Sequence, residues 1–558
     1  MITRFSGEKY KAFDSFDLTI KPLTILLGAN SCGKSAIINS LLMLSQTAET
    51  NFMSESALRL NGNKVGMGEI LNIIKDKKAE NILSFSFEID ESKIIKENIE
   101  RIKRECIESY IMPIRYVGYL FRRDNTTNAS DEYLDSILYD LDVAYVGSDG
   151  MKKRLKNISS KIIAGIKYYR AQKDSIKKVK MPKALSDFLD NVSFKKIDDC
   201  FNKLLSIQST RLSADKISYS FKYHKKEDAM IVSRLFLYNK NNELIISVTN
   251  EKSKVVNFES DIIDVSVLKN SKSDIQKLLN LSSLSIVKNS SIRTTSIDIL
   301  RDSNNPFAFF LSRVLQASIS QLMNELSDTN INHVSPLRAF PQRYYLLDKS
   351  VYHNQLNALD GTELAEVLKK NPKIKDEINN LFAEFNIAID VEKVNDIIHK
   401  ITVNQESVNL ELTDVGFGIS QVLPILVQAY LSPQYSITII EQPEIHLHPK
   451  MQAWLADALI EIALNGKKRF LIETHSDALV RRIRLRIVDS DNKLSEDDVR
   501  IYHLERNNLN NCTHLNKIPI NSDGDIKWPS EFMDVEINDT LMIQQFKFNR
   551  ISRNSQGK

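Results

Sequence analysis

The sequence predicts an α/β fold whose sheet-forming segments are interrupted by a helical insertion. Three observations support this fold class. An apolar strand at 23–27 runs into the glycine-containing loop Gly28–Ser35 and then into a helical stretch. Alternating strand patterns flank a Lys-rich helical block at 91–215 on both sides. Short apolar strands at 436–440 and 469–472 are separated by a helical stretch, which is typical of a parallel β-α-β unit.

Composition is that of an ordinary globular protein. The chain has 558 residues, 42% hydrophobic and 26% charged, which is enough for two or more domains. The net charge of +4 is too small to indicate a nucleic-acid partner by itself. The four cysteines form no C-x-x-C pair, which argues against a zinc site and favours a reducing compartment. Without a signal-like N-terminus or an apolar run of about 20 residues, we expect a cytoplasmic protein with no membrane segment.

The loop Gly28–Ser35 reads G-x-x-x-x-G-K-S. After a strand and before a helix, this pattern predicts a phosphate site, because glycines let the main chain wrap phosphate oxygens and the helix N-terminus directs N–H groups at them. Lys34 would neutralise the β- and γ-phosphates, and the Ser35 hydroxyl would bind Mg²⁺. An ordinary glycine-rich turn is the alternative. The predicted nucleoside triphosphate contacts are Asn30, Ser31, Cys32, Gly33, Lys34, Ser35 and Ala36.

A second glycine-rich turn, Asp414–Gln421, precedes an apolar helix at 422–431. A turn of this kind at a helix N-terminus can make another phosphate contact, with Gly416, Gly418 and Ser420 as candidate residues. A plain helix cap would give the same pattern, so this turn is not diagnostic alone.

Two apolar strands of the second half end in polar residues. The strand 437–440 is followed by Glu441 and Glu444, and a carboxylate at a strand end beside a phosphate loop is where Mg²⁺ and its water are held. The strand 470–472 is followed by His475, which could donate a hydrogen bond to a γ-phosphate. Either pattern alone also fits a strand ending in a polar loop. Their order after the phosphate loop favours the functional interpretation.

This order resembles the head of an ABC-type ATPase, in which a mixed sheet carries the P-loop beside an antiparallel β lobe. The segments Glu441–Pro449 and Glu473–Ser476 resemble the branch related to SMC and OLD-family proteins rather than a transporter subunit. Other segments are similar to a bacterial group of stand-alone ATPases that includes those of the Septu anti-phage systems, the PtuA group. These segments are Leu60–Gly62, Pro336–Arg338 and Trp528–Phe532. The helical insertion is not covered by the resemblance.

The resemblance implies ATP and Mg²⁺ as cofactors and a homodimer, or a higher homo-oligomer, that forms through the heads. Each ATP would lie on Asn30–Ser35 of one chain and be closed by Gly416–Gln421 of the other, with Ser35 and Glu441 on the metal. The residues at the reacting phosphate would be Gln442, Glu444 and His475. ATP binding would assemble the heads, and hydrolysis would release them.

Two positions depart from the family pattern. Glu441 stands where the family usually has a metal-binding aspartate, and a glutamate can still bind Mg²⁺. Gln442 stands where a glutamate normally polarises the attacking water, and a neutral amide cannot act as a carboxylate base. We therefore expect hydrolysis to be slow or absent unless Glu444 takes over. The triplet Glu444, His446 and His448 could also be read as a metal site if the segment were extended.

Patterns and resemblance together divide the chain into four parts. Residues 1–90 would form the N-terminal half of the ATPase head, with the P-loop, and 91–215 the helical insertion. Residues 216–330 would carry antiparallel strands and then a helical segment. Residues 331–558 would form the C-terminal half of the head, with the glycine-rich turn, the acidic strand end and the histidine.

Two basic segments are candidate partner surfaces. Residues 151–180 contain eleven lysines and arginines, one acid and two tyrosines. Such a helix suits a nucleic-acid backbone, and a protein partner or a solvated face are the alternatives. Five acids at 131–142, just upstream, favour a protein or intramolecular contact. The run Arg481–Arg486 leaves the same alternatives open.

The sequence thus favours an ATPase subunit of an anti-phage defence complex that regulates a separate nuclease. No nuclease site is expected in this chain, because the acids after His475 are scattered in a polar loop. The resemblance implies an HNH-type nuclease as partner, and some similar ATPases accompany retron reverse transcriptases with their RNA and DNA. The alternative is an SMC-like DNA-repair ATPase with DNA-stimulated hydrolysis, although the insertion lacks the sustained heptads of long arms.

Overall fold

The chain folds into two compact units, each built from separate stretches. Residues Met1–Leu18 and Asn39–Asp328 form the first unit, and Thr19–Ile38 and Thr329–Lys558 form the second. The computed structural model describes residues 1–49, 56–90, 92–123, 128–146, 150–172, 181–251, 254–279, 281, 283–285, 305–338, 341–346, 356, 363–405, 408–507, 511–528, 539 and 541–547. Four of the predicted basic-helix lysines (Lys173, Lys177, Lys178 and Lys180) and the motif end Pro529–Phe532 lie outside these residues.

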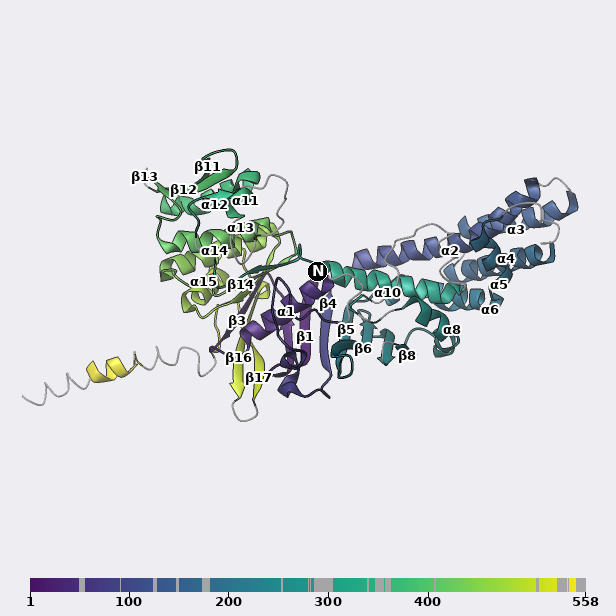
Figure 1. The fold of residues 1–558 in the computed structure, drawn as a ribbon, viewed down its shortest axis with the longest axis horizontal. Helices are drawn as coiled ribbons and strands as arrows, with labels where there is room; N and C mark the ends of the chain where they lie inside the picture. The colour runs from purple at the N-terminus through teal and green to yellow at the C-terminus, as the bar shows by residue number, and fades with distance from the viewer. Residues whose placement is uncertain are drawn as a thin grey trace, which may run out of the picture. The chain divides into compact units, whose positions relative to one another are not determined.

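The β lobe of the first unit is a seven-stranded antiparallel sheet with the order β2-β1-β4-β5-β6-β7-β8 (Figure 1). Its strands are β1 Ile2–Tyr10, β2 Phe13–Thr19, β4 Leu83–Ile89, β5 Lys216–His224, β6 Ala229–Tyr238, β7 Leu244–Glu251 and β8 Lys254–Glu259. The alternation in β4 buries Phe85 and Phe87, whose rings stack on Phe5 of β1. Because β4 pairs with β5, the sheet is continuous across the helical insertion.

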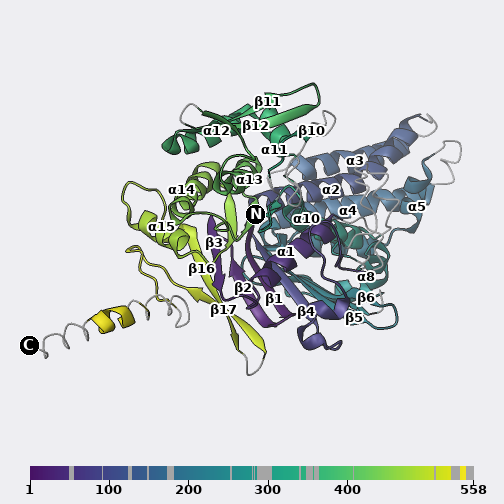
Figure 2. The ribbon, with the colours of Figure 1, turned by 60° about the vertical axis from the view of Figure 1, so that its left-hand side comes forward.

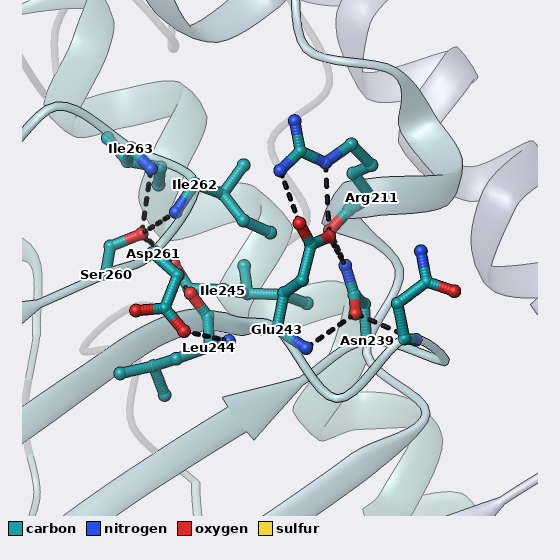
Figure 3. A network of polar contacts seen from close by, with 10 residues as sticks. Arg211, Asn239, Glu243, Leu244, Ile245, Ser260, Asp261, Ile262 and Ile263 are labelled. Atoms are coloured by element: carbon teal, nitrogen blue, oxygen red, sulfur yellow. Dashed lines mark hydrogen bonds and ion pairs between the residues drawn. The ribbon is translucent and has the colours of Figure 1, made fainter.

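The hairpin turn between β6 and β7 is fixed by side chains (Figure 3). Asn239 Oδ1 accepts hydrogen bonds from the main-chain N–H groups of Asn241 and Glu243, both at 3.0 Å. Arg211 donates to Glu243 Oε1 at 2.6 Å, so the turn is also tied to the end of the insertion. Asn242 takes the left-handed conformation, with φ +59°, that such a turn requires.

Helices make up the rest of the first unit. They are α2 Ser92–Arg123, α3 Asn128–Val146, α4 Met151–Gln172, α5 Lys183–Asn191, α6 Phe194–Asp199, the π-helix η3 Cys200–Leu205, α7 Ser209–Leu212, α8 Val265–Leu278 and α10 Pro306–Glu325, with 3₁₀ turns η1 Ile70–Ile73 and η2 Lys75–Lys77. Helix α10 packs along α2 and α8, as both ribbon views show. None of the helices within the described ranges combines the length and apolar character needed to cross a bilayer.

The second unit is built on a six-stranded mixed sheet with the order β17-β16-β3-β15-β14-β9. Its strands are β3 Leu23–Gly28, β9 Ile331–Val334, β14 Ile437–Glu441, β15 Arg469–Glu473, β16 Val499–Asn507 and β17 Cys512–Ile518. All neighbouring pairs are parallel except β16 with β17. The central strands β3, β14 and β15 are fully buried, which explains their uninterrupted apolar sequences.

Helices and a small antiparallel sheet complete the second unit. The helices are α1 Lys34–Ala48, which continues into the first unit, α11 Leu364–Lys370, α12 Pro372–Phe382, α13 Phe417–Leu431, α14 Pro449–Gly466 and α15 Asp477–Val488, with 3₁₀ turns η4 Ala383–Phe385 and η5 Glu496–Asp498. The small sheet contains β10 Tyr345–Leu346, β11 Ile387–Lys393, β12 Ile398–Gln405 and β13 Val408–Glu411, beside α11 and α12 (Figure 2). Trp454 of α14 stacks on Phe382 at 5.1 Å between ring centroids. The predicted fold class is confirmed: an α/β protein with a P-loop strand in a mixed sheet, an antiparallel β lobe and helices between their segments.

Candidate functional site

The predicted phosphate loop connects β3 to α1. Gly28 and Gly33 have φ values of +142° and +108°, which side chains rarely tolerate. A Cβ at Gly28 would also lie 2.5 Å from the carbonyl oxygen of Leu504 in the neighbouring strand β16. Asn30 and Ser31 are exposed, whereas Cys32 is buried and burial raises the pKa of its thiol. The loop therefore presents main chain, and not a reactive cysteine, to a ligand.

Lys34 and Ser35 begin α1, and both already contact polar groups of the same unit. Lys34 Nζ donates to the carbonyl oxygens of Gly28 (2.9 Å) and Ala29 (3.0 Å) and lies 3.8 Å from Glu473 Oε1. Ser35 Oγ donates to Glu473 Oε2 at 3.2 Å. The lysine is buried, whereas Ser35 is exposed and Ala36 is half-buried. These contacts keep the loop closed over its own lysine.

Two carboxylates lie side by side at the carboxyl edge of the sheet. Glu441 ends β14, Glu473 ends β15, and the two residues are paired in register. Burial and the nearby Glu441 raise the pKa of Glu473 to about 7, against the opposing charge of Lys34. Glu441 is also held by His333 of β9, with 2.7 Å between Oε1 and Nε2. A crowded acid pair beside the Ser35 hydroxyl is a set of hard oxygen donors, which fits Mg²⁺.

The loop after β14 is tightly turned. Gln442 has φ +44°, an uncommon conformation for a residue with a side chain, and its N–H donates to the carbonyl oxygen of Glu473 at 2.7 Å. Glu444 accepts hydrogen bonds from Thr474 Oγ1 and from the main-chain N–H of His475, both at 2.7 Å. Glu444 therefore ties this loop to the end of β15.

The alternative reading of Glu444, His446 and His448 as a metal site does not fit this geometry, because the segment is turned and not extended. His448 Nδ1 instead accepts from the N–H of Lys450 and caps α14. Across the described ranges, no group of three His, Cys, Asp or Glu side chains is placed to hold a metal ion.

His475 lies at the exposed end of β15, just before α15. Partial burial and the charge of Lys34 lower the pKa of its imidazole, and Glu444 opposes the shift. The ring is thus largely neutral near pH 7 and has one N–H to donate. Because β15 pairs with β3, His475 follows the strand next to the one that leads into the phosphate loop.

The glycine-rich turn differs from the expected one at its boundary. Helix α13 begins at Phe417 with Gly416 as its N-cap, so Ser420 lies inside the first helical turns and not in a loop. Its side chain is 3% exposed, because the apolar spacing of Ile419 and Val422 extends the helix backward into the core. Gly416 is exposed, and a Cβ added at Gly418 would lie 3.9 Å from Leu447, in the loop after β14.

The structure thus gathers the phosphate loop, Glu441, Gln442, Glu444 and His475 at one edge of one sheet. Sequence reasoning did not assign roles to Glu473, His333 or Arg338, which all lie at this edge. Glu473 directly follows the apolar strand predicted at 469–472, and this position of a carboxylate at a strand end was the signal available for it. The contacts of the other two depend on strand β9, whose neighbour in the sheet is far away in sequence.

Most arginines of the basic run Arg481–Arg486 make contacts within the second unit. Arg482 and Arg486 donate to Asp457 of α14, at 2.6 and 2.8 Å for the closest contacts. Burial of Asp457 would raise the pKa of its carboxyl group, but the hydrogen bonds from these two arginines outweigh it and lower that pKa. Arg484 donates to the carbonyl oxygen of Gly524 and lies over the ring of Trp528. The run therefore holds α15 in place.

The basic helix α4 keeps more of its charge exposed. Lys161 pairs with Asp140 of α3, and Arg170 donates to the carbonyl oxygens of Leu189, in α5, and Val192, just after it. Lys152, Lys156 and Lys167 are exposed. Asp140 of α3 thus pairs with one lysine of α4, whereas Asp135 and Asp142 of α3 pair with arginines of α2.

The strand order and the phosphate loop define a P-loop nucleotide-binding protein. The model of the AAA ATPase domain family matches residues 1–480, and the chain belongs to this family. No curated protein matches the chain.

Solved structures similar to the chain are SMC head domains. A head bound to the C-winged helix domain of ScpA is 7% identical, with a TM-score of 0.36 over 93% of this chain and 98% of that chain. The head from Thermotoga maritima is 7% identical, with a TM-score of 0.32 over 93% and 99%. A Pyrococcus furiosus head bound to the C-terminal domain of ScpA is 12% identical, with a TM-score of 0.32 over 93% and 96%. These likenesses are distant, and the fold class rests on strand order and the family match.

Proposed function

We propose that the chain is an ATP- and Mg²⁺-dependent switch subunit of a bacterial anti-phage defence complex in the cytoplasm. Its heads would dimerise on ATP and regulate a separate nuclease of the HNH type. The proposal rests on one observation. The phosphate loop, Ser35 and Glu441 lie at one edge of the sheet, and Gln442 stands there where the family pattern has the catalytic base. An amide can orient water but cannot take its proton, so the site suits binding better than turnover.

In this proposal, ATP replaces the internal contacts of the phosphate loop. Main-chain N–H groups of Asn30–Ala36 hold the phosphates, and Lys34 exchanges its two carbonyl partners for phosphate oxygens. Ser35 and Glu441 hold Mg²⁺, with Glu473 beside them. Bound Mg²⁺ would neutralise charge on the phosphates.

In this proposal, two chains dimerise through the exposed start of the glycine-rich turn. Gly416 and Gly418 of one chain would close over the ATP of another, as the resemblance to ABC-type heads implies. Helix N-termini attract anions, so the start of α13 suits this contact. Ser420 would reach a phosphate only if α13 unwinds at its first turn, because its side chain is buried. The two glycines are therefore the stronger candidates.

The helical insertion is the proposed surface for a nuclease or a retron-type reverse transcriptase with its RNA and DNA. Five large apolar side chains on α2 and α3 are strongly exposed: Ile94 (50%), Tyr119 (55%), Tyr133 (55%), Tyr139 (71%) and Val143 (53%). Exposed aromatic side chains are enriched in protein interfaces. Hydrogen bonds from Arg115 to Asp142 and from Arg122 to Asp135 hold α2 and α3 together beside them.

The alternative is an SMC-like DNA-repair ATPase. The exposed lysines Lys152, Lys156 and Lys167 of α4 favour it, because a row of cations can follow a phosphate backbone. This function requires hydrolysis that DNA stimulates.

The test is ATP hydrolysis by the full chain, with and without double-stranded DNA, beside Lys34→Ala as a binding-deficient control. The switch proposal expects slow turnover that DNA does not change. Rapid, DNA-stimulated turnover that Lys34→Ala abolishes would contradict it and support the repair ATPase.

A further inference from the structure

A buried arginine lies beneath the loop that carries Gln442. Arg338 follows β9 by four residues and is 7% exposed. Its Nη2 donates to two successive carbonyl oxygens, those of Glu441 (3.2 Å) and Gln442 (3.0 Å). A single guanidinium group thus donates hydrogen bonds to the main chain at the point where β14 ends and the turn begins.

The other nitrogen atoms of this guanidinium group have no hydrogen-bond acceptor among the described residues. Among the residues that the structure describes, Arg338 Nε and Nη1 are buried without a hydrogen-bond partner. Burying a cation with unpaired donors costs free energy, and such groups persist where they serve a site. Burial lowers the pKa of Arg338 to about 10, against the opposing charge of Glu444, so the side chain is a cation at neutral pH.

The loop above Arg338 needs support from outside. Gln442 holds φ +44°, which costs energy for a residue with a side chain, and only its N–H is tied to β15. Glu444 is the next anchor, through Thr474 and the N–H of His475. Arg338 is therefore bonded directly to the main chain of Gln442, and Glu444, two residues further along the same loop, ties that loop to His475.

We propose that Arg338 is the positioning residue for recognition of the terminal phosphate: it sets the main chain of Gln442 and, through Glu444, that of His475. This inference rests on the proposed ATP-binding function. Nothing in it involves Lys34 or the phosphate loop, which lies two strands away after β3. Arg338 accordingly matters for the γ-phosphate and not for the α- and β-phosphates.

The experiment compares ATP and ADP affinity, both with Mg²⁺, for the full chain and for Arg338→Gln. The matched control is Arg469→Gln. Arg469 is 5% exposed and donates from Nε to the carbonyl oxygen of Tyr435 at 3.1 Å, but it begins β15 at the opposite edge of the sheet. We expect Arg338→Gln to lose at least about tenfold of the preference for ATP over ADP while ADP affinity changes less than about threefold. Arg469→Gln should keep the wild-type preference.

A second variant separates positioning from folding. Arg338→Lys keeps the positive charge but not the planar fork, so it should fold and recover only part of the preference. The double variant Arg338→Gln with Glu444→Gln should lose no more of the preference for ATP over ADP than the more affected single variant. The reason is that both residues hold the same loop after β14.

Three results would overturn the inference. The first is an unchanged ATP preference in folded Arg338→Gln or Arg338→Lys. The second is an equal loss in the Arg469→Gln control. The third is a double variant whose losses multiply. Wild-type protein that binds neither nucleotide would overturn the proposed function itself, and this inference with it.

Discussion

The two loops that meet at the carboxyl edge of the second unit are built in different ways. The phosphate loop after β3 is held largely by contacts close in sequence: Lys34 donates to the carbonyl oxygens of Gly28 and Ala29, six and five residues away, and Glu473 adds a distant contact. The loop after β14 is held by residues far along the chain, Arg338 and the end of β15. A local loop keeps its function as long as its motif is intact, whereas a loop held from a distance can be retuned by changes elsewhere.

Among variants that test this difference between the two loops, we expect the largest change in ATP hydrolysis for Gln442→Glu, which supplies the missing carboxylate base. General-base catalysis contributes about 10²- to 10⁴-fold, so ATP hydrolysis should rise by roughly that factor. Phosphate release under single-turnover conditions measures it, with Gln405→Glu in β12 as a control at a distance. A rate that stays at the wild-type level would show that the loop after β14 is not where catalysis is limited.

The next effect concerns the phosphate loop. Lys34→Met removes the cation that would bind the β- and γ-phosphates, a loss of about 3 kcal/mol or roughly 100-fold in ATP affinity. Calorimetric titration with Mg·ATP tests this, and Lys375→Met, whose ion pair with Asp390 lies in the small sheet region, serves as the control. A loss below about threefold would mean that the loop does not bind the triphosphate as its motif predicts.

Glu444→Gln tests the distant contacts. The amide has a single acceptor oxygen for two donors and leaves the charge of Arg338 without its nearby carboxylate, so the free energy of unfolding should fall by about 1–2 kcal/mol. Denaturant titration measures it, with the half-buried Glu496→Gln as the control. Equal stability of both variants would contradict the role of Glu444 as the tie between the loop and β15.

The smallest effect lies at the opposite edge of the same sheet. Lys468 donates to the carbonyl oxygens of Ala429 and Tyr430, and burial lowers its pKa to about 8. Between pH 8 and 10.5 the unfolded chain then binds more protons than the folded one, so this residue makes stability rise with pH in that window. Relative to Lys468→Met, the wild type should gain roughly 1–2 kcal/mol from pH 8 to 10.

Unfolding curves at several pH values test this prediction, with the neighbouring exposed Lys467→Met as a matched control. The Lys467→Met comparison should be flat with pH. If the stability difference between the wild type and Lys468→Met also stayed constant with pH, the predicted contribution of the buried Lys468 to the pH dependence of stability would be wrong.

The sequence predicted what local patterns determine. The strand, loop and helix around Lys34 are a continuous segment, and the parallel pairing of β14 with β15 follows from two apolar strands around one helix. The start of α13 was misplaced, because glycine at 416 and 418 resembles a loop while the apolar spacing already continues the helix.

Contacts between distant segments could not be predicted from one sequence. The hydrogen bonds of Arg338 to Glu441 and Gln442 and that of His333 to Glu441 exist only once β9 pairs with β14. The same holds for the run Arg481–Arg486, whose charge looked available until the structure paired two of its arginines with Asp457. Charge counts along a chain therefore overestimate free positive surface wherever helices such as α14 and α15 pack together.

The most direct test of the central claim is the size of the full chain in solution with Mg·ATP, with Mg·ADP and without nucleotide, beside Lys34→Ala. Sedimentation velocity reports it without a partner protein. The switch account predicts a larger assembly with ATP only, which Lys34→Ala fails to form. Wild-type protein of one size under all three conditions, although it binds ATP, would contradict the account.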